Sequence, residues 1–237
     1  MKRHLAAGMR LLAAHDMAFG VAGHATARDP GRPGHFWVNP FGFAYATMRP
    51  EHLSLVRHDG VVVEGAAVNA AAFAIHAELH RARPDVHCAV HGHPVHGTAF
   101  SALGRQLLPI GQDICAFHGD HVLFDEPMGL VLGLQEGARI AAVLGEHKAA
   151  ILRNHGPVTV GRTVDEAFWW FLLMERGCRT QLLAEAVGMP SVIPDPAARS
   201  IAAAIGTPEF GWFQCQPLIE PFLQAIAREG RREPGAS

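Results

Sequence analysis

The sequence lacks the features that mark several common classes of protein. Only 18% of its 237 residues are charged and its formal net charge is −2, so no basic field exists to hold nucleic acid or an anionic membrane. The apolar stretch near its start is interrupted by Arg10, His15 and Asp16, which argues against a signal peptide or membrane span. The four cysteines lie far apart and form no CxxC pair, which favours buried, reduced thiols in a cytoplasmic protein.

Two kinds of residue are abundant in the sequence: 49% of its residues are hydrophobic, and 16 are histidines. The high hydrophobic fraction predicts a sizeable core. The length fits one large domain, which we place at residues 1–229. The polar tail at 230–237 is expected to be disordered. Histidine is the commonest metal ligand and the usual acid–base group near neutral pH. An excess of histidine proves nothing alone, so the spacing of these residues has to decide.

Local patterns predict strand pairs joined by short turns, followed by helices that do not alternate strictly with strands. This order argues for an antiparallel or mixed sheet covered by helices. The clearest helix is 164–187, because Thr163 and Glu166 form a capping-box pattern and Gly188 follows the helix. Helices are predicted at 2–17, 69–82, 94–103, 135–147, 164–187, 196–204 and 208–228. Strands are predicted at 24–28, 36–39, 53–57, 61–64, 88–91, 121–124, 131–132, 149–153 and 158–160.

The sharpest chemical signal is the triplet His91-Gly92-His93 at the end of a short apolar strand. Side chains at positions i and i+2 of a strand point to the same face, with Cα atoms about 6–7 Å apart. Two imidazoles so placed can converge on one ion, and Gly92 leaves room for the backbone to bend. A pair of ordinary strand histidines is the alternative interpretation.

His155 is the candidate for a third ligand. It follows the apolar strand at 149–153 and stands in Asn154-His155-Gly156-Pro157. A histidine at a strand end beside glycine and proline is aimed by a rigid turn. From the bare sequence, a turn histidine that faces solvent is the more common case.

Longer segments around these histidines resemble the class II aldolase and adducin family. Residues 74–101 read AIHAELHRARPDVHCAVHGHPVHGTAFS and resemble the core motif of the family, as does ILRNHGPVTVGRTVDEAF at 151–168. Residues 23–28 resemble the early G-N-x-S-x-R segment, and residues 39–42 resemble the T-P-x-G turn. The similarities follow in the order of the family from about residue 3 to residue 187.

The resemblance implies a fold, an assembly and a cofactor. The fold is a three-layer α/β/α sandwich with a mainly antiparallel central sheet. The assembly is a cyclic homotetramer with sites near the subunit interfaces. The cofactor is a divalent metal ion bound by His91, His93 and His155. Three imidazoles with an open position suit Zn2+ best, and Fe2+, Mn2+ or Co2+ fit the same ligands.

The chain departs from the sugar-phosphate aldolases of this family at positions that carry their chemistry. The aldolase acid–base glutamate corresponds to Ala72, which cannot take up a proton. The serine pair of the phosphate pocket corresponds to Ala70 and Ala71, and a phosphate dianion needs several hydrogen-bond donors. These losses resemble the adducin-like branch of the family and predict that the substrate is not a sugar phosphate.

Replacement residues follow from the same resemblance, each with the alternative of a merely structural side chain. The aldolase tyrosine that donates a proton has no match, and Gln112 or Asp113 occupies its region. The candidate catalytic residues are His118, His121 and Gln112, with Asp120, Asp125, His76, Glu78 and His80 as further acid–base groups nearby. The candidate substrate-binding residues are His24, Arg28, Asn39, Gly42 and His96.

Three functions compete at this stage. The first is a metal-dependent lyase, by aldol cleavage or decarboxylation, acting on a small oxo or hydroxy acid. The second is a three-histidine, non-haem iron oxygenase acting on an aromatic or a 2-oxo or 2-hydroxy acid. The third is a non-catalytic scaffold, as adducin is. Retention of the three histidines counts against the scaffold, and the frequency of lyases in the family favours the first.

Overall fold

One eight-stranded sheet forms the centre of the protein in the computed structural model, which describes residues 1–126 and 133–232. The strand order is β4-β3-β2-β1-β5-β8-β7-β6, and all neighbours are antiparallel except β6 and β7. The strands are β1 (His24–Arg28), β2 (His35–Val38), β3 (Ser54–Arg57), β4 (Val62–Glu64), β5 (Cys88–His91), β6 (His121–Phe124), β7 (Ala149–Leu152) and β8 (Gly156–Gly161). The strand predicted at 131–132 lies outside the described residues.

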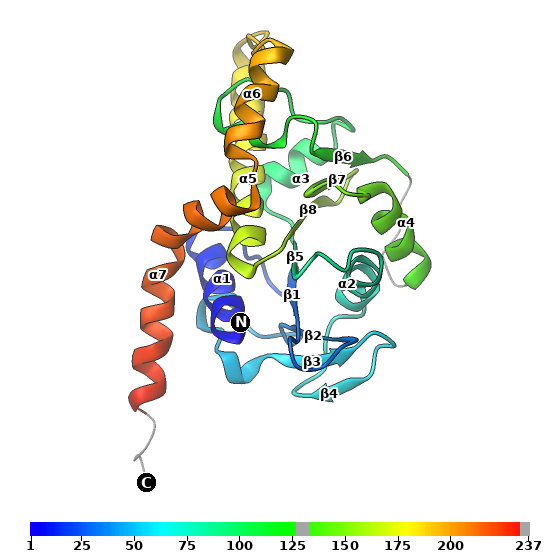
Figure 1. The fold of residues 1–237 in the computed structure, drawn as a ribbon, viewed down its shortest axis with the longest axis vertical. Helices are drawn as coiled ribbons and strands as arrows, with labels where there is room; N and C mark the ends of the chain where they lie inside the picture. The colour runs from blue at the N-terminus through cyan, green and yellow to red at the C-terminus, as the bar shows by residue number, and fades with distance from the viewer. Residues whose placement is uncertain (127–132, 233–237) are drawn as a thin grey trace.

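Helices cover both faces of this sheet and complete the predicted sandwich (Figure 1). They are α1 (Lys2–Ala14), α2 (Ala70–Ala82), α3 (Val95–Ser101), α4 (Leu134–Leu144), α5 (Val164–Val187), α6 (Asp195–Ile205) and α7 (Pro208–Arg232). The core formed by α1, α5 and α7 includes Ala25 and Ala27 of β1. His24 and Thr26 alternate with them and contact His76 of α2. The period of two along β1 therefore separates an apolar face from a polar one.

Helices α2 and α4 pack side by side on the polar side of β1, where Ile75, Leu79, Ile140 and Leu144 join one buried cluster. The two helices approach each other closely at Gly137. A Cβ atom added there would lie 1.9 Å from the carbonyl oxygen of Ala74, so only a residue without a side chain permits this packing.

The predicted elements are confirmed with shifted ends, and β1, β5, β6 and α5 have the predicted bounds. The Thr163 side chain accepts a hydrogen bond from the Glu166 N–H at 3.1 Å, which confirms the helix start. Helix α1 ends at Ala14 instead of residue 17, because Asp16 has a φ of 57° and cannot continue a right-handed helix.

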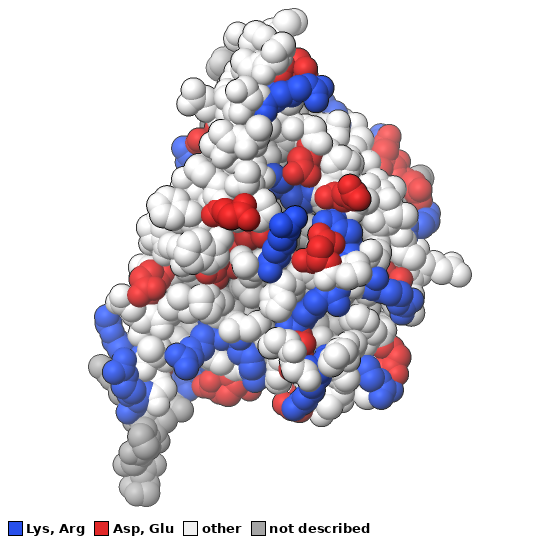
Figure 2. Space-filling view, in the orientation of Figure 1, with Lys and Arg blue, Asp and Glu red and all other residues white. Residues whose placement is uncertain are grey.

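The surface and the cysteines agree with the composition. All four cysteines are buried and free. On the face shown in Figure 2, acidic and basic side chains are interspersed. Arg83 forms an ion pair with Asp85, and Arg153 forms one with Asp125. Among the described residues, no helix has the length and apolar character needed to cross a bilayer.

Candidate metal centre

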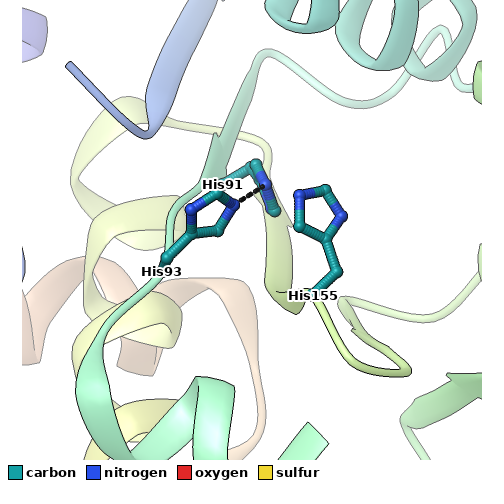
Figure 3. Close-up of side chains that lie close together, drawn as sticks. All are labelled: His91, His93 and His155. Carbon is teal, nitrogen blue, oxygen red and sulfur yellow. Dashed lines mark hydrogen bonds between the residues drawn. The ribbon is translucent and has the colours of Figure 1, made fainter. Parts of the chain in front are cut away.

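Three histidine side chains from two separate segments meet at the end of β5 (Figure 3). The ring centroids of His91 and His93 lie 5.1 Å apart, and those of His155 lie 4.6 Å from His91 and 4.7 Å from His93. One nitrogen from each ring lies within 4.8 Å of the other two. Nitrogens around a tetrahedral zinc ion lie about 3.3 Å apart, so modest ring rotations would bring the three onto one ion.

The β7–β8 hairpin brings the distant histidine to this place. Its strands close with Leu152 opposite Gly156, and Asn154 takes a φ of 58° in the turn. Gly156 lies so close to the end of β5 that a Cβ atom there would be 2.6 Å from the Gly92 carbonyl oxygen. The Asn-His-Gly-Pro segment thus supplies both the turn and the close approach that place His155 beside the other two rings.

The hydrogen bonds and burial of the triad suit metal binding. His91 donates its Nδ1–H to the Pro157 carbonyl at 3.0 Å, which leaves the lone pair on Nε2, 3.2 Å from Nε2 of His93. A backbone carbonyl that orients a ligand histidine in this way is usual in metal sites. His155 has no hydrogen bond at its buried Nδ1 within the described part of the chain, and Figure 3 shows its other ring nitrogen facing His91.

The protonation states of the three histidines also suit metal binding. Burial, reinforced by the neighbouring imidazoles, lowers the pKa of His91 well below its ordinary value. Burial lowers the pKa of His93, and it lowers the pKa of His155 to about 4. All three rings are therefore neutral near pH 7, the form that binds metal. No carboxylate of the described residues joins the group, so the site offers three neutral nitrogen ligands.

His24 is a fourth histidine beside the triad. It lies opposite His91 in the β1–β5 pairing, and the two ring centroids are 4.9 Å apart. Its Nδ1 lies 2.8 Å from Nε2 of His76. Nδ1 of His76 lies 2.6 Å from the hydroxyl oxygen of Thr26, which lies 2.9 Å from Nε2 of His80. A buried, hydrogen-bonded chain of side chains therefore leads from the triad along α2.

The other predicted substrate-binding residues near β1 and β2 are engaged elsewhere. The Asn39 side chain accepts a hydrogen bond from the Ala25 N–H at 3.0 Å, and Gly42 lies in an exposed turn with a φ of 85°. Arg28, at the far end of β1 from His24, donates to backbone carbonyls of His80, Val86 and Arg83. These contacts give Asn39 and Arg28 structural roles.

His96 lies three residues beyond His93 and points to a different partner. Its Nδ1 lies 2.7 Å from the carboxylate of Glu175, which also accepts hydrogen bonds from the backbone N–H groups of His96 and Gly97. Glu175 thereby holds the start of α3 against α5. A cavity of about 800 Å³ lies beside this pair, lined also by Trp169, and none of the triad residues lines it.

The three predicted catalytic residues are not in contact with the triad among the interactions of the described residues. Gln112 is exposed, and His118 lies 3.0 Å from the Asp195 carboxylate at the start of α6. His121 is buried, with Nδ1 2.7 Å from the Phe117 carbonyl and Nε2 accepting the Leu107 N–H at 2.9 Å. Both nitrogens of His121 are thus occupied within the fold.

Two partners of these histidines were not predicted from the sequence. Thr26 stands two residues after His24 in a strand, so alternation placed it on the same face, and this signal was available. Glu175 is 79 residues from His96 along the chain, and no local pattern connects the two.

Comparison with known proteins identifies the family. Residues 3–182 match the model of the Class II Aldolase and Adducin N-terminal domain, and the chain belongs to this family. It is 48% identical to Decarboxylase NovR of Streptomyces niveus, covering 89% of this chain and 77% of that protein. It is 47% identical to the 4-hydroxy-3-prenylphenylpyruvate oxygenase/4-hydroxy-3-prenylbenzoate synthase of Streptomyces roseochromogenus subsp. oscitans, covering 86% and 74% of the two chains.

A solved structure confirms the fold. The L-fuculose 1-phosphate aldolase from Glaciozyma antarctica PI12 superposes with a TM-score of 0.90 and 39% identity, covering 96% of this chain and 90% of that one. The predicted family and sandwich are therefore confirmed. The narrower assignment to the adducin-like branch is not supported, because the relatives at nearly half identity are named as a decarboxylase and an oxygenase.

Proposed function

We propose that this chain is a metal-dependent lyase that breaks a carbon–carbon bond, by aldol cleavage or decarboxylation, in a small, non-phosphorylated oxo or hydroxy acid. The observation that carries the proposal is the convergence of three neutral histidines without a carboxylate. An ion held by neutral ligands keeps its full charge, so the site favours an anionic substrate that binds through two oxygens. The 48% identical decarboxylase supports loss of carbon dioxide as the form of cleavage.

We assign separate roles to the residues of the site. His91, His93 and His155 would hold the ion, with His91 oriented by the Pro157 carbonyl. The bound ion, which we expect to be zinc, would supply a Lewis acid that polarises the substrate carbonyl, which favours breaking the carbon–carbon bond that begins at the carbon next to that carbonyl. His24, beside His91, faces the same site.

The exclusion of a phosphorylated substrate rests on the first turn of α2. This turn consists of Ala70, Ala71 and Ala72 and contains no acidic residue. It offers no hydroxyl to a phosphate and no carboxylate to move a proton. The 39% identical structure named as an L-fuculose 1-phosphate aldolase supports the opposite assignment, so L-fuculose 1-phosphate is the necessary comparison substrate.

An iron-dependent oxygenase is the second candidate, favoured by the 47% identical relative named as a phenylpyruvate oxygenase and benzoate synthase. Three neutral imidazoles leave coordination positions open for an organic acid and dioxygen, and they suit iron as well as zinc. In this candidate dioxygen is the oxidant and the acid loses carbon in an oxidative cleavage. Consumption of dioxygen separates the two candidates.

A homotetramer with sites near the subunit interfaces belongs to the same proposal. Large apolar side chains are available for such contacts, since Phe19 is 84% exposed and Phe213 of α7 is 64% exposed. Exposed apolar residues of this size commonly mark surfaces that another chain covers.

The first experiment measures metal content in protein purified without added metal. We expect one divalent ion per wild-type chain, none in His93→Ala, and an unchanged content in His15→Ala, which removes an exposed histidine. Circular dichroism and urea unfolding would establish that His93→Ala is folded. One ion per chain in folded His93→Ala would refute the ligand assignment. A wild-type protein that binds no metal would refute the lyase and the oxygenase and leave the non-catalytic scaffold as the remaining function.

The second experiment tests the reaction with zinc-loaded and, under anaerobic conditions, iron-loaded protein. Release of pyruvate from 4-hydroxy-2-oxo acids, or of carbon dioxide from aryl-pyruvates, without oxygen uptake supports the lyase. Oxygen uptake that requires iron and an aromatic 2-oxo acid supports the oxygenase. Efficient cleavage of L-fuculose 1-phosphate would contradict the argument from the alanine turn.

A further inference from the structure

Two neighbouring loops beside β1 and α2 carry no charged side chain. One consists of residues 39–44, Asn-Pro-Phe-Gly-Phe-Ala, which follow β2. The other consists of residues 65–70, Gly-Ala-Ala-Val-Asn-Ala, which end where α2 begins. The Phe41 N–H donates to the Ala67 carbonyl at 2.8 Å, so the two loops lie side by side. We call these two loops together the apolar lip.

The strand pairing places the apolar lip at the same end of the sheet as the histidine triad. His24 of β1 lies opposite His91 of β5, and β2 is the neighbour of β1 on its other side. The Asn39 side chain accepts the Ala25 N–H at 3.0 Å, which holds the start of the lip beside His24. Neighbouring strands are about 4.8 Å apart, so the lip begins about 10 Å from the end of β5. A small organic acid held at the triad and a side chain of the lip can together span this distance.

The lip and the triad also share one face of the sheet. The His24 ring contacts His76 of α2, and its centroid lies 4.9 Å from that of His91. The loop at 65–70 leads directly into α2, the helix that packs on this face. A ligand that binds at the triad and extends along the sheet past His24 would therefore meet the lip.

The lip exposes apolar surface that no other part of the fold covers. Phe41 is 51% exposed and Phe43 is 41% exposed, and Ala67 and Ala70 are exposed as well. The Phe43 ring lies 5.2 Å from the His52 ring, whereas within the described part of the chain no aromatic ring or cation stacks on Phe41. An apolar group that covers a half-exposed phenylalanine removes both surfaces from water, which is favourable.

We propose that the apolar lip receives the end of the substrate remote from its carboxylate, that this end is an aromatic or branched aliphatic group, and that Phe41 is a specificity-determining residue. The proposal rests on the proposed function, because it takes the carboxylate end of the substrate to bind at the triad. The triad and the lip together define an amphipathic substrate, with an anionic, chelating head and an uncharged apolar body. The inference holds for the lyase and for the oxygenase alike, since both use the same triad.

Three 2-hydroxy acids with the same head group test the inference. Lactate ends in a methyl group, 3-phenyllactate carries a phenyl group on that carbon, and 3-phosphoglycerate carries a phosphate group there. Each acid is titrated by calorimetry into the Co2+-loaded protein. We expect 3-phenyllactate to bind about ten-fold more tightly than lactate, as when roughly half of a phenyl ring is removed from water. We expect 3-phosphoglycerate to bind no more tightly than lactate, because the lip offers its phosphate no charged side chain.

The variants Phe41→Ser and Phe41→Leu form a matched pair. Serine removes the apolar surface of the side chain, whereas leucine keeps most of it. The preference for 3-phenyllactate over lactate should fall to about two-fold in Phe41→Ser and persist in Phe41→Leu. The Co2+ content and the affinity for lactate should be unchanged in both variants. Met189→Ser, which alters a 99% exposed residue beyond the end of α5, should behave as wild type.

The possible failures are distinguishable. Equal binding of lactate and 3-phenyllactate to the wild-type protein would overturn the inference and leave the proposed function standing. An unchanged preference in Phe41→Ser would also overturn it, because the phenyl group would then bind elsewhere; a change in assembly mass by light scattering in that variant would assign the lip to a second copy of the chain. Tighter binding of 3-phosphoglycerate than of lactate would overturn both the inference and the exclusion of phosphorylated substrates. A wild-type protein that takes up no Co2+ would refute the proposed function and the inference with it.

Discussion

Acidification should destabilise the metal-free protein through the buried histidines along α2. In the unfolded chain a histidine titrates near pH 6.5, whereas burial lowers the pKa of His80 to about 3 and that of His76 well below its ordinary value. Below about pH 6.5 the unfolded chain therefore binds one more proton per buried histidine than the folded chain does. Stability is complete above this pH and is lost as the pH falls, by about 2 kcal/mol per histidine at pH 5. Two such residues cost about 4 kcal/mol, a large part of the stability of an ordinary domain.

The assay is urea unfolding of chelator-treated protein at about pH 7 and about pH 5, followed by tryptophan fluorescence. The matched variant is His80→Gln, which keeps a donor toward Thr26 and cannot take up a proton. It should lose about 2 kcal/mol less than wild type over this range. Burial raises the pKa of Glu166, which opposes the trend, but this contribution cancels between the two proteins. Equal losses in wild type and His80→Gln would refute the account, and His15→Gln, at an exposed position, should behave as wild type.

Two further predictions concern close packing. Gly137→Ala should lower the free energy of unfolding by about 2–3 kcal/mol, measured by urea unfolding, because the new Cβ meets the Ala74 carbonyl. Gly133→Ala should cost much less, because a Cβ there has no neighbour within 4 Å among the described residues, and equal effects would contradict the packing argument. Glu175→Gln should cost about 2 kcal/mol, because one acceptor that serves His96 becomes a donor, and hydrogen exchange at the start of α3 should rise; unchanged exchange there would show that Glu175 does not hold α3.

The fold could be predicted from sequence where local patterns carry the information. The prediction of a hairpin with β1 as its first strand, and the residues Thr163 and Gly188 at the two ends of α5, were sufficient for the bounds of these elements. The end of α1 could not be predicted, because it depends on the left-handed conformation of Asp16 and not on hydrophobic spacing. The parallel pairing of β6 with β7 was not predicted, although the helix predicted at 135–147 lies between these strands in the sequence and supplies the crossover that parallel neighbours need.

The candidate site, like the fold, could be predicted from the sequence only in part. The spacing of His91 and His93 on one strand predicts two rings on one face, but only the β7–β8 hairpin brings His155 to them, and that expectation came from resemblance to a family. The predicted catalytic residues His118 and His121 were chosen because the resemblance places their segment near the site. In the structure His118 Nε2 lies beside Asp195, and both nitrogens of His121 have partners within the fold.

The buried chain shows what physical reasoning adds to residue types. Strand alternation places Thr26 beside His24, and helical spacing places His76 and His80 on one face of α2, so each pair was visible in the sequence. That α2 lies across this face of β1 was not, because it depends on which side of the sheet the helix packs. Where the two faces meet, His24, His76, Thr26 and His80 form one buried chain joined by three hydrogen bonds.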